Sequence, residues 1–198
     1  MSTRGRRLWL WAHGPAQAPD GTLVGWQDPP LRDPADERLK VLELAKRIGA
    51  STTVHASDRR RARQAARPMA RALGARLEVT AALRDIDYGR WTGLTWPEVR
   101  RQYPDGYGRY MANWHEAAMP GGESQADLQA RVARWWSRVK VTGDVVVVAH
   151  TGSLRALAAE VLGWSPDDAV GVALARGHYA ILDLDGQAPP EWNLPLSM

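Results

Sequence analysis

Cysteine is absent from this chain of 198 residues, which excludes disulfides, cysteine-ligated metal sites and cysteine nucleophiles. A long apolar run is also missing near the start of the chain. The first apolar stretch ends at His13 and is too short for a signal peptide or a membrane span. We therefore expect a cytoplasmic protein with no membrane partner.

Lysine is scarce, since only three of the 26 basic residues are lysine. The net charge is +4, and the run DRRRAR at 58–63 raises nucleic-acid binding as an alternative. Against it, Arg59, Arg60, Arg61, Arg63 and Arg67 would occupy several faces of a helix, and no stacking aromatics lie between them. We expect no nucleic-acid partner.

Length and composition favour one domain over residues 1–198, because 44% apolar residues can fill one sizeable core. Apolar runs alternate with helical periods, which predicts a three-layer α/β/α sandwich around a mostly parallel sheet. The expected strands are 8–13, 52–57, 76–80, 145–150 and 179–184, and the expected helices are 35–48, 58–74, 95–103, 124–140 and 152–163.

The segment 84–123 shows no strong single period and reads as a lid or insertion over the sheet. It is rich in Trp and Tyr, which could stack on a flat substrate or could simply pack the insertion onto the sheet, and we expect packing to account for most of them. The tail after Gly186 reads as an irregular surface extension.

Two apolar strands end in the same way. LWLWAHG places His13 after the first, and VVVVAHTG places His150 after the fourth. A lone histidine at a strand end is more often a satisfied core residue, but the pair points to a site, because ligands gather beyond the carboxyl ends of parallel strands.

Helix starts are expected at the same edge of the sheet. The helix after His150 begins near Thr151, and Ser57 is expected to cap the helix that carries Arg61. Helix N-termini, an arginine and two histidines together favour an anion, with phosphate as the natural candidate.

Four motifs in order carry a resemblance to the histidine phosphatase superfamily, the phosphoglycerate mutase-like proteins. They are SDRRRARQAA at 57–66, LRDIDYGRWTGLTWPEV at 83–99, PGGES at 120–124 and VVVVAHTGSLRAL at 145–157. The resemblance spans residues 7–185 and is closest to the α-ribazole phosphatase and broad-specificity phosphatase branch. It implies a phosphoglycerate mutase-like fold.

The resemblance also implies roles for individual residues. His13 would be the nucleophile that forms a phosphohistidine, and His150 would hold the phosphoryl oxygens. Arg61 would give a planar fork to those oxygens. Asp85 would be the general acid and then the base, in a place where relatives usually have glutamate.

Further residues are implied around this centre. Gly14 and Thr151 would help to bind phosphate, and Glu123 and Ser124 would line the rim. No cofactor and no metal are required. The implied function is hydrolysis of a small phosphorylated metabolite, such as an α-ribazole phosphate-like compound, by a phosphoric monoester hydrolase.

The first motif departs from the pattern Arg-His-Gly-x-Thr that the resemblance implies. Ala12 stands in place of the arginine, Ala16 in place of the threonine, and Pro19 where many relatives have asparagine. Losing one charge-assisted contact to a developing charge costs about 10²- to 10³-fold in rate.

Three explanations of this departure stay open. Another cation, such as Arg7, Arg59 or Arg155, could fill the empty place in a working phosphatase. The protein could instead bind an anionic ligand without turnover, as a sensor or partner protein. Alternatively, the pocket could be converted to a substrate that is not a phosphate ester. The sequence leaves the substrate and the oligomeric state open.

Overall fold

The computed structural model describes residues 5–49, 52–170, 174–186 and 188–193. Six strands form one sheet in the order β3-β2-β4-β1-β5-β6. The strands are β1 (Arg7–Ala12), β2 (Thr53–Ser57), β3 (Leu77–Thr80), β4 (Val145–Ala149), β5 (Tyr179–Asp183) and β6 (Glu191–Trp192). The first four strands pair in parallel, whereas β5 runs antiparallel to β1 and β6 runs antiparallel to β5.

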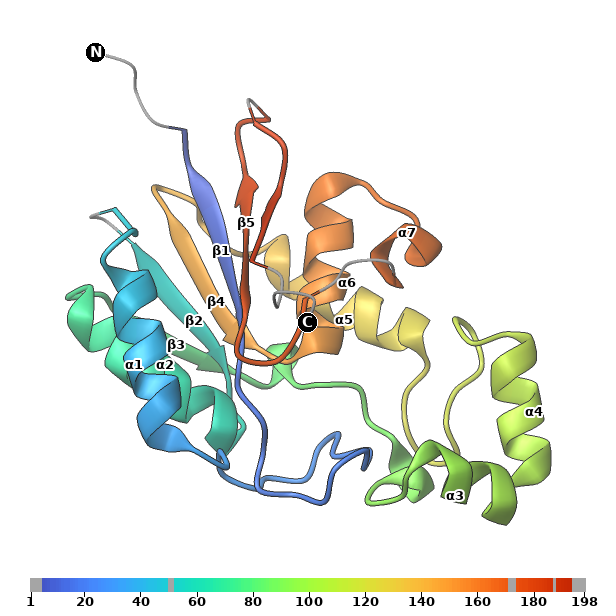
Figure 1. The fold of residues 1–198 in the computed structure, drawn as a ribbon. Coiled ribbons are helices and arrows are strands. Elements are labelled where there is room, and N and C mark those ends of the chain that lie inside the picture. The colour runs from blue at the N-terminus through green and yellow to red at the C-terminus, as the bar shows by residue number, and fades with distance from the viewer. Residues whose placement is uncertain (1–4, 50–51, 171–173, 187, 194–198) are drawn as a thin grey trace.

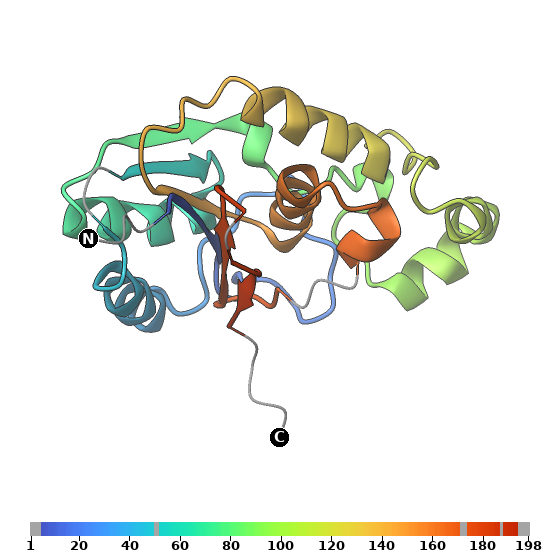
Figure 2. The same cartoon turned by 90° about the horizontal axis from the view of Figure 1, so that it is seen from above.

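Helices cover both faces of this sheet, so the expected three-layer α/β/α sandwich is confirmed. Helices α1 (Pro34–Ala45) and α2 (Arg60–Ala72) lie on one face, and α5 (Gln125–Trp136) and α6 (Thr151–Leu162) lie on the other (Figures 1 and 2). The short helix α7 (Pro166–Val170) follows α6.

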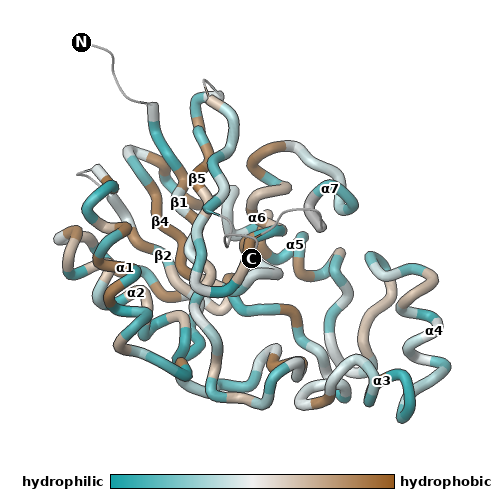
Figure 3. The backbone as a smooth tube through the Cα atoms, in the orientation of Figure 1, coloured by the Kyte–Doolittle hydropathy of each residue, from teal (hydrophilic) through white to brown (hydrophobic). Residues whose placement is uncertain are grey.

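Alternation along β1 explains why the sheet is buried on both faces. Leu8, Leu10 and Ala12 pack into the cluster beneath α5 and α6, whereas Trp9 and Trp11 pack into the cluster beneath α1 and α2. Strand β4 is apolar throughout, as is typical of a parallel strand covered on both sides. The hydrophobic strands therefore run through the centre of the molecule (Figure 3).

The segment 84–123 leaves the sheet and extends to one side, where α3 (Trp96–Gln102) and α4 (Pro104–Ala112) lie (Figure 1). The sequence predicts the first of these helices and misses the second, because Gly106 and Gly108 lower the helix propensity of that stretch. Both helices begin with a proline in their first turn, where its missing N–H costs nothing.

Two further expectations need correction. The tail after Gly186 is not wholly irregular, because Glu191 and Trp192 form an edge strand against Ile181 and Ala180. Ser57 does not cap α2, which begins at Arg60 after Arg59, without a side-chain cap. The Ser57 hydroxyl instead accepts a hydrogen bond from the Arg59 N–H, at 3.3 Å, and turns toward the site described next.

Candidate active site

The two histidines that follow β1 and β4 come together at the carboxyl edge of the sheet. The strands are parallel neighbours, and the His13 N–H donates to the Ala149 carbonyl at 3.1 Å. His13 Nε2 and His150 Nδ1 are 2.9 Å apart, and both side chains are buried. The imidazoles meet edge to face, with centroids 4.8 Å apart.

Hydrogen bonds determine which ring nitrogen carries a proton. His13 Nδ1 lies 2.6 Å from the Gly14 carbonyl oxygen, which can only accept, so Nδ1 carries the proton and Nε2 keeps its lone pair. His150 Nδ1–H donates to that lone pair, and the Ser57 hydroxyl donates to His150 Nε2 at 2.9 Å. The chain Ser57–His150–His13 leaves His13 Nε2 as an unprotonated nitrogen at the pocket floor.

Electrostatics favour the same neutral state. Burial lowers the pKa of His13 to about 3, and the positive charges of Arg61 and Arg176 add to this effect. Burial also holds the pKa of His150 well below its usual value, with further lowering by His13 and Arg61. Both rings are therefore neutral near pH 7, and His13 Nε2 carries a lone pair and no proton.

A pH dependence of stability follows from these two depressed pKa values. Unfolded histidines take up protons below about pH 6.5, whereas the folded rings stay neutral, so the unfolded state binds more protons and the free energy of unfolding decreases as the pH falls. We expect each ring to contribute about 1.4 kcal/mol per pH unit in this range. Urea unfolding between pH 7 and about 5 should show a flatter dependence for His13→Gln/His150→Gln than for the wild type. Equal slopes would contradict the buried neutral pair.

Three hydrogen bonds hold the Arg61 side chain beside His13. Its side chain is only 1% exposed, and its Nε–H donates to His13 Nε2 at 3.2 Å. Nη1 donates to the Gln27 carbonyl at 2.6 Å and Nη2 to the Gly25 carbonyl at 2.8 Å. Arg61 thus points into the pocket, unlike its exposed neighbours Arg60 and Arg67.

Glu37 supports the backbone that follows His13, a contribution that the sequence does not reveal. Its buried carboxylate accepts the Trp11 Nε1–H at 2.7 Å and the Gly14 N–H at 3.0 Å. A Cβ at Gly14 would lie 2.5 Å from Glu37 Oε2, so this close approach requires glycine. Gly14 therefore acts through its backbone, because its carbonyl fixes the His13 ring.

Asp85 lies in the pocket wall near the amino end of α6. Burial raises the pKa of its carboxyl group, against the opposing charge of Arg61. Its Oδ1 would be 2.7 Å from a Cβ at Gly152, so the missing side chain there makes room for the carboxyl group. A carboxyl group with a raised pKa can hold a proton for a leaving oxygen.

These groups line one cavity of about 950 Å³. His13, Arg61, Asp85, His150 and Thr151 all contribute to it. Among the residues that the structure describes, no group of three or more histidine and acidic side chains could hold a metal ion.

Some aromatic residues of the segment 84–123 line the cavity, and others pack this segment onto the core. Tyr88, Trp96, Tyr110 and Trp114 line the cavity. Trp91 is fully buried, and Tyr103 and Tyr107 pack against the core cluster. Four aromatic side chains thus form a wall on the side of the cavity away from the sheet.

The two expected rim residues lie outside the cavity lining. Glu123 forms an ion pair with Arg131 at 2.8 Å, and its carboxylate also accepts the Asp87 N–H. Ser124 caps α5 through a reciprocal pair of hydrogen bonds with Asp127. The structure does not bring either side chain together with the histidines.

The three arginines suggested as substitutes for the arginine missing at position 12 lie in different parts of the structure. Arg7 begins β1 at the far end of the strand, 4.0 Å from Glu191. Arg59 lies over the Trp26 ring and 3.9 Å from Asp58, outside the cavity lining. Arg155, one turn into α6, does line the cavity, and so does Arg176, which the sequence did not single out.

Within the described residues, no helix is both long and apolar enough to cross a membrane.

Comparisons with known proteins give the family and the fold of this chain. The model of the histidine phosphatase superfamily (branch 1) matches residues 8–193. Phosphoserine phosphatase 1 of Hydrogenobacter thermophilus is 28% identical over 73% of this chain and 70% of its own length. The adenosylcobalamin/α-ribazole phosphatase of Salmonella typhimurium is 24% identical over 90% of each chain. The structure of the α-ribazole phosphatase from Shigella flexneri has the same fold, with a TM-score of 0.80 at 22% identity over 96% of each chain.

Proposed function

Because the chain belongs to the histidine phosphatase superfamily, we propose that it hydrolyses phosphate monoesters through a phosphohistidine on His13. The observation that carries this proposal is the neutral His13 Nε2, which faces a cavity shared with Arg61, His150 and Asp85. A nucleophile, cationic donors and an acid in one cavity are the parts that phosphoryl transfer needs.

The first step forms a bond from His13 Nε2 to phosphorus and breaks the bond between phosphorus and the ester oxygen. Asp85 gives its proton to the departing oxygen, which leaves as an alcohol. As the bond to phosphorus forms, His150 Nδ1–H and Arg61 Nε–H leave the His13 Nε2 lone pair and donate to phosphoryl oxygens instead, where they stabilise the negative charge.

The second step returns the enzyme to its starting state. A water molecule attacks phosphorus, the bond to His13 Nε2 breaks, and the Asp85 carboxylate takes the water proton. Inorganic phosphate leaves, and Nε2 regains its lone pair. Glu37 holds Gly14 in place, so His13 Nδ1 keeps its proton throughout the cycle.

The shape of the cavity supports a substrate with a flat ring, of which an α-ribazole phosphate-like compound is one example. The volume of about 950 Å³ is far larger than a phosphate group needs. Trp114 and Tyr110 line the cavity, and aromatic side chains of this kind can stack on a flat ring. Two relatives are named as phosphatases that act on small metabolites, one on phosphoserine and one on α-ribazole compounds. For this chain we propose a phosphorylated small metabolite that carries a flat ring.

The test is a panel of phosphate monoesters assayed by phosphate release. We expect nucleoside 5′-monophosphates and other ring-bearing esters to have a kcat/KM about two- to tenfold above that of glycerol 3-phosphate, because stacking contributes about 0.5–1.5 kcal/mol. Trp114→Ala should raise KM for the ring-bearing esters only. Trp164→Ala, at an exposed tryptophan outside the cavity lining, is the matched control.

Two outcomes would count against this assignment. Equal kcat/KM values across the panel, unchanged by Trp114→Ala, would remove the ring from the proposed substrate. Binding of phosphate esters with no phosphate release would favour a protein that senses an anion without turnover, an alternative that Ala12 and Ala16 keep open.

A further inference from the structure

We propose that Arg176, from the loop that precedes β5, supplies the second guanidinium of the phosphoryl site. This inference deepens the proposed function and rests on its assignment of the cavity floor to a phosphate group. It names a residue from the far end of the chain, about 160 positions after the nucleophile.

The need for another cation follows from the contacts of Arg61. A guanidinium has five N–H bonds. Three of those in Arg61 already point at His13 Nε2, the Gln27 carbonyl and the Gly25 carbonyl. Arg61 therefore has only part of its guanidinium available to a ligand, and a doubly charged phosphate needs further donors beside it.

Backbone hydrogen bonds place the Arg176 loop against the end of β1. The Gly177 N–H donates to the Ala12 carbonyl at 2.7 Å, and the Ala12 N–H donates to the His178 carbonyl at 3.0 Å. Gly177 has a φ of +74°, and a Cβ there would lie 3.8 Å from the Gly14 Cα. Arg176 thus emerges beside the loop that carries the nucleophile.

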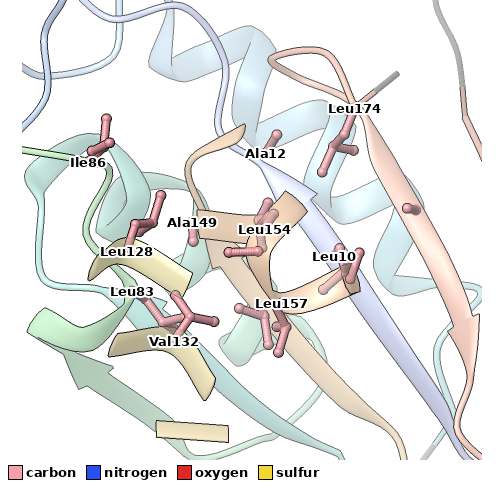
Figure 4. Close-up of a cluster of buried hydrophobic side chains, with 14 of the residues drawn as sticks. Leu10, Ala12, Leu83, Ile86, Leu128, Val132, Ala149, Leu154, Leu157 and Leu174 are labelled. Carbon is pink, nitrogen blue, oxygen red and sulfur yellow. The ribbon is translucent and has the colours of Figure 1, made fainter. Parts of the chain in front are cut away.

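The packing around position 12 disfavours a long charged side chain at the end of β1. Ala12 is fully buried, and Leu174 is 1% exposed in the same cluster. Figure 4 draws both at the same end of that cluster, near Leu154. A long side chain at position 12 would have to displace neighbours in this cluster, whereas alanine fits without displacing any.

The Arg176 side chain is free to bind a ligand. It is exposed, it lines the cavity, and in the described ranges it has neither an ion pair nor a side-chain hydrogen bond. Its charge contributes to the lowered pKa of His13 and also acts on Asp85. Arg155 also lines the cavity, but it interacts electrostatically with Asp85, the proposed proton donor to the leaving group.

The experiment measures phosphate affinity and turnover separately, on the full chain. Inorganic phosphate is titrated by calorimetry, and kcat/KM is measured on one phosphate monoester. We expect Arg176→Ala to weaken phosphate binding about tenfold or more and to lower kcat/KM about 100-fold, because a charge-assisted contact to the developing charge is lost. The phosphate affinity and kcat/KM of Arg176→Lys should lie between those of the wild type and those of Arg176→Ala, because lysine keeps the positive charge but cannot form the paired hydrogen bonds of a guanidinium. Arg67→Ala, at an exposed arginine of α2, is the control and should match the wild type.

A relocated arginine adds a second test. In the wild type, Ala12→Arg should lower the midpoint of thermal unfolding with no gain in turnover, because position 12 is fully buried in the core cluster. A folded Arg176→Ala protein with wild-type phosphate affinity and turnover would overturn the proposal, as would an Ala12→Arg variant that is stable and faster. Phosphate binding that depends on Arg176 in a protein without turnover would support this inference and reject the proposed function.

Discussion

His13→Asn is expected to lower the rate of phosphate monoester hydrolysis by about 10⁴-fold or more, the largest effect of any single substitution in the chain. Asparagine has no basic nitrogen at the position of Nε2, so no bond to phosphorus can form. Arg61 and the residues of the cavity wall would remain, so binding of the ester should weaken far less than turnover. Steady-state kinetics together with calorimetric binding of a slowly hydrolysed ester measure the two effects.

The matched control for this variant is His55→Asn. His55 is also buried, but it lies against Trp135 and Glu78, outside the cavity lining. Its substitution should leave kcat unchanged in the folded protein. A His13→Asn protein that folds and keeps more than about a tenth of wild-type turnover would exclude His13 as the nucleophile.

Asp85→Asn is expected to lower kcat/KM for alkyl phosphate esters by about 10²- to 10⁴-fold, because the departing alkoxide loses its proton donor. The effect should depend on the leaving group. For p-nitrophenyl phosphate the departing phenolate needs no proton, so phosphorylation of His13 should slow far less and the later water attack should become rate-limiting. A burst of nitrophenolate is then expected in the variant.

The pH profile gives an independent reading of Asp85. Burial raises the pKa of this carboxyl group, and the acid works only while protonated, so kcat/KM for alkyl esters should fall as the pH rises through that pKa. Asp85→Asn should lose this alkaline limb. Asp87→Asn is the control, because the Asp87 carboxylate accepts the Gly89 N–H and lies outside the cavity lining. An unchanged limb in Asp85→Asn would assign the acid to another group.

The meeting of the two histidines could be predicted from the sequence. Parallel strands bring their carboxyl ends to one edge, so two buried strands that each end in Ala-His must place these rings close together once the strands are neighbours. The position of Arg61 was also predictable, because it lies in the first turn of α2. Its expected cap was wrong, since Ser57 donates its hydroxyl hydrogen to His150 instead of capping the helix.

Glu37 and Arg176 could not be found in the same way. Glu37 lies in the first turn of α1, where an acidic residue usually faces solvent, and only the close approach of Gly14 and Trp11 reveals its role. Arg176 precedes an antiparallel strand, whose amino end reaches the site only because β5 pairs with β1. Both depend on contacts between elements that lie far apart in the sequence.

A phosphoryl group bound to His13 during turnover can be trapped and located. Wild-type protein is mixed with an isotopically labelled phosphate monoester, quenched in base within one turnover, digested and read by mass spectrometry. We predict a phosphoryl group that is stable in base, labile in acid and located on His13, and we predict that its amount rises in Asp85→Asn with a p-nitrophenyl ester. Full turnover with no phosphoryl group on the protein, or with the group on a residue other than His13, would contradict the account.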